Sequence, residues 1–294
     1  RALPSPVTRE QRVEVWRSYI ERLHDPTQRA ILRAMKMFLR KQARRYASRL
    51  RRVTQGKSIT KGITEQELEL LLAEEAERIA LAQVARPLVA TALMKSYRTA
   101  LKQMGAGEKV FDPIRLDNAI ASSLGELVTN VSWTTKKVVR DTVLKGYLEG
   151  LSIAAIQRDL ILSKAFDPAR SLRIARTEAT RNTNFGALAA MSSAADAGVP
   201  VRKMWITAGD AEVRDGHWEL DGIYVFADEP FESWAGSPQC PGGFGEAGMD
   251  INCRCNLIPF VEEREAAEFS EERKPFREAE LDTFFPDDVT PGED

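Results

Sequence analysis

The fold class is decided by residues 194–207, AADAGVPVRKMWIT, because a helical pattern ends and a strand pattern begins within them. Upstream, a helix is expected over about 168–197, with Asp167 as its cap, Pro168 at its first position and Gly198 just past its end. Downstream, three short stretches have the composition of strands: 201–207, 222–226 and 251–260. The sequence therefore predicts an α+β fold with a small β-sheet that forms late in the chain.

The part of the chain before residue 165 has a helical pattern almost throughout. Apolar residues recur every three or four positions over 32–53, and Thr64 and Glu67 form a capping box for the next helix. We expect a break at residues 24–26, which end in a proline, and a kink or break at Pro87. Two further helices are expected, over 112–147 and 152–162.

These patterns predict three parts. An extended all-helical N-terminal arm covers 1–165, a compact α+β domain covers 166–261, and an acidic tail covers 262–294. The composition is that of a soluble globular protein, with 43% hydrophobic and 29% charged residues and a net charge of −1. No apolar run approaches the roughly 18 residues that span a bilayer, so we expect no membrane partner. The three cysteines lie late in the chain and indicate a reducing compartment rather than a disulfide framework.

Charge is distributed unevenly along the chain. Residues 29–57 hold eleven Lys or Arg and no acid, whereas acids outnumber bases about three to one in the tail. Such a stripe can bind an acidic protein surface, including the chain's own tail, or the phosphates of DNA with a strong salt dependence. It can also be a solvated face, and the sequence leaves these interpretations open. The candidate binding residues are Arg33, Lys36, Arg40, Arg44, Arg45, Arg49 and Arg52.

The last third holds an ordered set of motifs. Ala175-Arg176-Thr177-Glu178 comes first, then Trp205 with Asp210, Arg214, His217, Leu220 and Gly222, and then Asn252-Cys253-Arg254-Cys255. Over roughly 151–259, this set resembles the head morphogenesis family typified by the F protein of phage Mu. That family has an A-R-T-E helix, W-x₄-D-x₃-R-x₂-H-x₂-L-x-G and N-C-R-C in this order. Where a P-G-D-P type turn is expected, this chain has residues 237–243, so Cys240 is an addition to the pattern.

The resemblance implies a structural minor head protein of a tailed bacteriophage, not an enzyme. It implies a low-copy component of the virion head near the portal vertex, present in the host cytoplasm during assembly. The expected partners are the portal and the major capsid or scaffold proteins, with packaged double-stranded DNA as a further one. On this interpretation, Arg176, Glu178, Asp210 and Arg214 have structural roles.

The cysteines and one histidine suggest a metal site. His217, Cys240, Cys253 and Cys255 have the number and type of ligands of a structural zinc site. The C-x-C spacing is unusual, but residues two apart on a strand point to the same face, so both thiolates could converge. Asp210 could replace Cys240 as a ligand. The alternative, which the sequence leaves open, is that the cysteines are small buried side chains and His217 is a hydrogen-bonded core histidine.

An enzyme is the competing interpretation of the same residues. Glu178, Asp210, Arg214 and His217 could perform acid–base chemistry, as a metal-dependent hydrolase or nucleic-acid-modifying enzyme centred on Asp210 and His217. The sequence has no nucleophile elbow, H-E-x-x-H or phosphate-binding glycine loop. Arg-Thr-Glu also suggests an ADP-ribosyltransferase, but the strands that such a fold requires are missing from the pattern. A third interpretation is a non-specific DNA-binding protein that uses the basic helix over 29–57.

Overall fold

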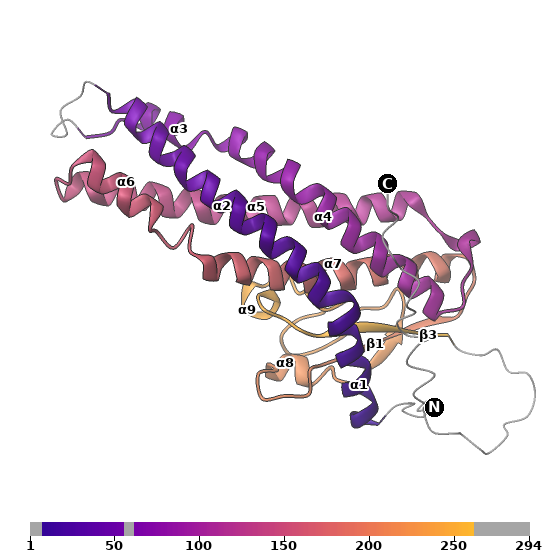
Figure 1. The fold of residues 1–294 in the computed structure, drawn as a ribbon. Coiled ribbons are helices and arrows are strands. Elements are labelled where there is room, and N and C mark those ends of the chain that lie inside the picture. The colour runs from indigo at the N-terminus through magenta and orange to yellow at the C-terminus, as the bar shows by residue number, and fades with distance from the viewer. Residues whose placement is uncertain (1–7, 56–61, 262–294) are drawn as a thin grey trace, which may run out of the picture. The chain divides into compact units, whose positions relative to one another are not determined.

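The computed structural model describes residues 8–55 and 62–261 of the chain (Figure 1). The predicted acidic tail therefore lies outside the described residues. The helices, in chain order, are α1 (Arg9–Tyr19), the π-helix η1 (Ile20–His24), α2 (Asp25–Val53), α3 (Glu65–Leu72), α4 (Glu74–Gln103), the 3-10 helix η3 (Glu108–Val110), α5 (Pro113–Leu148), α6 (Ile153–Ile161), α7 (Pro168–Asp196), α8 (Asp215–Trp218) and α9 (Ala247–Asp250). The strands are β1 (Val201–Ile206), β2 (Tyr224–Phe226) and β3 (Asn256–Val261).

The predicted α+β class is confirmed: a mostly helical region precedes a small antiparallel sheet with short helices. The sheet order is β2-β1-β3, so β1 lies in the centre, and Lys203 is opposite both Val225 and Pro259. The third strand begins at Asn256 rather than at residue 251, because α9 and a turn with Asn252 at φ 60° precede it. Asparagine is one of the few residues that adopt this left-handed backbone readily.

The break predicted at residues 24–26 is wrong. The chain remains helical through residues 24–26, because a π-turn forms at η1 and the Asp25 N–H bonds to the Ile20 carbonyl. Pro26 has no N–H for the Arg22 carbonyl, and the Lys95 ammonium donates to that carbonyl instead, at 3.0 Å. Helix α4 continues through Pro87, so of the kink or break expected there the chain does not break, and the kink stays a prediction.

The helix that starts at the confirmed Thr64–Glu67 capping box ends at Leu72, before the kink or break that was expected at Pro87. The break falls at Ala73, which has a left-handed φ of 40°. This conformation costs an alanine about 1–2 kcal/mol. Burial of three α3 leucines offsets that cost; they pack in one core with residues of α2, α5 and α6. The leucines are Leu68, Leu71 and Leu72.

The chain forms two compact units. One comprises residues up to 28, 89–121 and those from 176 on, and the other comprises 29–88 and 122–175. In the first unit, the sheet side chains Met204, Ile206 and Ile258 pack against α1. The predicted domain division at residues 165 and 261 stays a prediction. Within the described part of the chain, no helix is both long and apolar enough to cross a membrane.

Candidate metal centre and basic surface

Three potential metal ligands converge beside the sheet. His217 comes from α8, and Cys253 and Cys255 come from the segment between α9 and β3. The His217 Nδ1 lies 3.3 Å from the Cys255 Sγ and 3.7 Å from the Cys253 Sγ. All three side chains are buried, and their ligand atoms lie within 4.8 Å of one another. Cys240 is also buried but is not a member of this group, and neither is Asp210.

Polar side chains of α7 hold the cysteine segment in place. The Thr180 hydroxyl donates to the Cys253 carbonyl. The Asn184 amide donates to the Cys255 carbonyl at 3.0 Å and accepts from the Leu257 N–H at 2.8 Å. These contacts satisfy buried backbone groups at the point where the chain enters β3. The sequence analysis missed both residues, although two polar positions four apart on one helix face were a usable signal.

The surroundings of the histidine are apolar and aromatic. The Phe244 ring stacks on the His217 imidazole at 5.2 Å with an interplanar angle of 2°, and Trp205 meets it edge-on at 5.6 Å. Among the described residues, the buried Nε2 of His217 has no hydrogen-bond partner. The ring is thus held by packing, with Nδ1 directed at the two thiols.

The two thiols differ in their ionisation. A hydrogen bond with Cys255 lowers the pKa of Cys253 well below its ordinary value, and His217 adds to this effect. Burial raises the pKa of Cys255. Cys253 therefore loses its proton more readily than Cys255, and thiolate is the form that ligates a metal.

The charged motif residues do not converge on a common point. The Asp210 carboxylate pairs with Arg254 through two contacts of 2.7 and 2.8 Å, and this pairing lowers the pKa of Asp210. Arg214 donates to the Met249 and Ile251 carbonyls. Each side chain instead ties one loop to another.

The Arg-Thr-Glu part of α7 is largely buried. Glu178 forms a buried ion pair with Arg181 at 3.0 Å. The Thr177 hydroxyl accepts from the Asn252 N–H at 3.1 Å, next to the cysteines. Arg176 is half-buried beside His24. The motif therefore contributes packing and hydrogen bonds around the cysteine segment.

The predicted basic residues of α2 have two different environments. Arg45 and Arg49 form ion pairs with the buried Glu77 at 2.6 and 2.8 Å. Burial opposes ionisation of Glu77, but its contacts with Arg45, Gln42 and Arg49 outweigh this effect and lower its pKa. The other five are exposed, and within the described part of the chain they form no ion pair: Arg33, Lys36, Arg40, Arg44 and Arg52.

Four of the exposed cations form what we call the basic stripe: Arg33, Lys36, Arg40 and Arg44. Lys36, Arg40 and Arg44 line a cavity of about 420 Å³ together with Phe166 and Ile161. At about 1.5 Å per residue, the stripe extends roughly 16 Å along α2.

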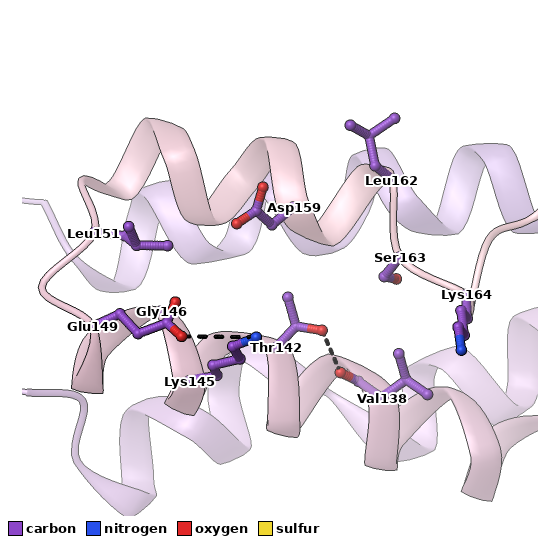
Figure 2. Close-up of a pocket in the computed structure, with 10 residues that line it drawn as sticks. All are labelled: Val138, Thr142, Lys145, Gly146, Glu149, Leu151, Asp159, Leu162, Ser163 and Lys164. Carbon is purple, nitrogen blue, oxygen red and sulfur yellow. Dashed lines mark hydrogen bonds and ion pairs between the residues drawn. The ribbon is translucent and has the colours of Figure 1, made fainter.

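A second cavity, of about 480 Å³, lies between α5 and α6 (Figure 2). Lys145 of α5 pairs with Glu149, just after the end of α5, at 3.7 Å, and Asp159 of α6 lies opposite them (Figure 2). None of the predicted site residues lines this cavity. Its charges are mixed in sign, so it does not select a ligand class.

Comparison with known proteins finds a similarity to one family. Residues 137–258 match the family described as Phage Mu protein F like protein. The chain is 33% identical over 148 residues to the NAD(+)--arginine ADP-ribosyltransferase EFV of Enterococcus faecalis, which is 50% of this chain and 29% of that relative. It is 30% identical over 138 residues to the minor head protein GP7 of Bacillus phage SPP1, which is 47% of this chain and 42% of that relative. The chain thus spans less than half the length of either relative, and no solved structure matches it.

Proposed function

We propose that this chain, a member of the Phage Mu protein F like family through residues 137–258, is a structural minor head protein of a tailed bacteriophage. The similarity to a minor head protein supports this role. The observation that carries this proposal is that the charged motif side chains form contacts within the protein itself. Asp210 is engaged by Arg254, Arg214 by two carbonyls, and Glu178 by Arg181, so these residues hold the α+β part together.

The proposed partners follow from this role. The compact α+β part would be the anchor and the helical part the reaching element. The basic stripe would bind an acidic surface of the portal, the major capsid or the scaffold protein, near the portal vertex of the virion head. Opposite charges at a protein interface favour encounter and fix the register of the partners.

The test is incorporation into heads. The chain is expressed with the portal, scaffold and major capsid proteins of its phage, and purified heads are assayed for its presence. We expect a few copies per head, and about tenfold fewer for Arg33→Glu/Arg40→Glu/Arg44→Glu. A matched control, Arg98→Glu/Lys102→Glu/Arg140→Glu, reverses three exposed cations elsewhere and is expected to be incorporated normally. Absence of the unmodified chain from heads would contradict the proposed function.

A second candidate function is non-specific DNA binding. The observation in its favour is that the four cations of the basic stripe have no acidic partner within the described residues and follow one face of a long helix. If the stripe neutralises about four phosphates, its affinity for DNA should decrease roughly 100-fold when the salt concentration is raised from 50 to 200 mM.

Duplex binding measured by fluorescence anisotropy separates the two candidates. If DNA is the partner, the triple reversal of the basic stripe abolishes binding at 50 mM salt and the control triple does not. If the unmodified protein and the triple variant of the basic stripe bind the duplex equally weakly, DNA is not the partner of the stripe, and the protein-partner proposal stands.

An enzymatic role is the alternative from another class, and one relative bears the name of an ADP-ribosyltransferase. The matched region is 29% of that relative, and the Glu178 carboxylate of this chain is buried against Arg181. A general acid or base must reach its substrate. We therefore assign Glu178, Asp210 and Arg214 structural roles.

One zinc ion is the cofactor that we propose for the α+β part. A sheet of three short strands gains stability from a metal cross-link, because binding energy at such a site adds to folding free energy. His217, Cys253 and Cys255 provide nitrogen and sulfur ligands of the type that zinc prefers.

A further inference from the structure

We infer that the protein supplies only three zinc ligands, His217, Cys253 and Cys255, and that the fourth position belongs to an exchangeable ligand from solvent. This inference rests on the proposed zinc cofactor. It differs from a closed four-ligand site, in which Cys240 or Asp210 would complete the shell.

The spacing of the ligand atoms fits one tetrahedral ion. With Zn–S of about 2.3 Å and Zn–N of about 2.0–2.1 Å, a tetrahedral site has N–S edges of about 3.6 Å. The His217 Nδ1 lies 3.3 and 3.7 Å from the two sulfur atoms, so both N–S distances are within about 0.3 Å of the tetrahedral value. The stacked Phe244 and the edge-on Trp205 hold the imidazole in this orientation.

Neither of the other candidate ligands is available. The Cys240 Sγ lies outside the group of converging ligand atoms, in a turn where Lys203 binds the neighbouring Gln239 at 2.6 Å. Both oxygens of Asp210 are engaged by Arg254. Glu212, although near, is exposed and is not a member of the group.

Space for a fourth ligand lies beside all three protein ligands. A cavity of about 10 Å³ is lined by His217, Cys253 and Cys255, and also by Glu212 and Arg214. This is close to the smallest volume that holds one water molecule. Three protein ligands with a water in the fourth position are typical of catalytic zinc sites, whereas structural sites usually have four protein ligands. With three ligands the ion would still join α8 to the segment before β3, so it would cross-link the fold and keep one exchangeable position. The fourth position of this site would accept water or a small anion that enters past Arg214.

The experiment uses the full chain and counts ligands one at a time. Zinc is measured by elemental analysis in the unmodified protein, in Cys240→Ser and in Cys253→Ser. We expect about one zinc per chain in the first two and at least a tenfold loss in Cys253→Ser. Cys240→Ser is the matched control, because it removes an equally buried thiol outside the group. Loss of zinc from Cys240→Ser would overturn the three-ligand assignment.

Cobalt substitution supplies a second readout, because the band intensity per bound cobalt counts the thiolate ligands rather than the amount of metal bound. The sulfur-to-cobalt charge-transfer band should have the same intensity in Cys240→Ser as in the unmodified protein. Added azide should shift the visible cobalt bands saturably, because it displaces the solvent ligand. A loss of about one third of the charge-transfer intensity, or bands that do not respond to azide, would show a closed site and overturn the inference. Failure of the unmodified chain to bind zinc or cobalt would overturn the cofactor proposal as well, but would not affect the head-protein proposal.

Discussion

At the scale of single residues, Asn184 is the side chain on which the cysteine segment depends most. Its amide bonds to the Cys255 carbonyl, the Leu257 N–H and the Thr180 carbonyl, and it is fully buried. Asn182, two positions earlier on α7, is equally buried, but neither polar atom of its side chain has a partner among the described residues. The two asparagines therefore allow hydrogen bonding to be separated from burial.

We expect Asn184→Ala to reduce the free energy of unfolding by about 2–4 kcal/mol, because the buried Leu257 N–H and Cys255 carbonyl lose their partner. Asn182→Ala removes the same atoms without removing a hydrogen bond, and is expected to cost at least about 2 kcal/mol less. Urea denaturation of both variants measures the difference. Equal losses would mean that Asn184 contributes only by filling space.

Another prediction at this scale concerns Glu77. Its folded-state pKa is lowered, so the stability that it contributes is present above its unfolded value near 4.5 and is lost as the pH falls through the folded value. The unmodified protein should therefore lose stability more steeply than Glu77→Gln as the pH decreases below about 4.5. Glu69→Gln, at an exposed position of α3, is the control and should follow the unmodified protein. Parallel curves for all three proteins in denaturation from pH 3 to 7 would refute the assigned role.

At the scale of elements, the junction of α1 and α2 shows how a proline is accommodated within a helix. The Arg22 carbonyl would ordinarily accept from the N–H of residue 26, which Pro26 lacks. The Lys95 ammonium takes that place, and burial lowers the pKa of Lys95. The π-turn and the lysine together allow the helix to pass through a position where it would otherwise end.

A double-mutant cycle tests whether the Lys95 ammonium replaces the N–H that Pro26 lacks. Lys95→Met should cost about 1–3 kcal/mol, because the buried side of this junction loses the hydrogen bond from the Lys95 ammonium to the Arg22 carbonyl. In a Pro26→Ala background the residue 26 N–H can bond to that carbonyl, so the same change should cost clearly less. Chemical denaturation of the four proteins gives the coupling energy, and additivity would indicate that Lys95 does not compensate for the proline.

At the scale of the whole molecule, the near-neutral net charge is the sum of two segments of opposite charge. Residues 262–294 hold thirteen acids and four bases, whereas 29–57 hold eleven bases and no acid. A protein that ends at residue 261 would therefore be strongly cationic. We expect it to bind a DNA duplex at 50 mM salt at least tenfold more tightly than the full chain, and the difference to decrease sharply by 300 mM salt. Equal anisotropy titrations at low salt would show that the tail does not modulate this surface.

Features that depend on neighbours in the sequence were predictable. The Thr64–Glu67 capping box, Pro168 at the start of α7 and the late, small sheet are confirmed, because each depends on backbone preferences within a few residues. The ordered motifs also predicted the similarity to this family, and the matched region 137–258 overlaps the region of the predicted resemblance.

Only the tertiary structure decided which distant side chains meet. His217 lies beside Cys253 and Cys255 but not with Cys240, Asp210 is engaged by Arg254, and two of the seven basic residues are used internally by Glu77. The break at Ala73, which the sequence pattern did not predict, has the same origin. The physical reason is that packing over tens of residues outweighs local preferences of about 1–2 kcal/mol.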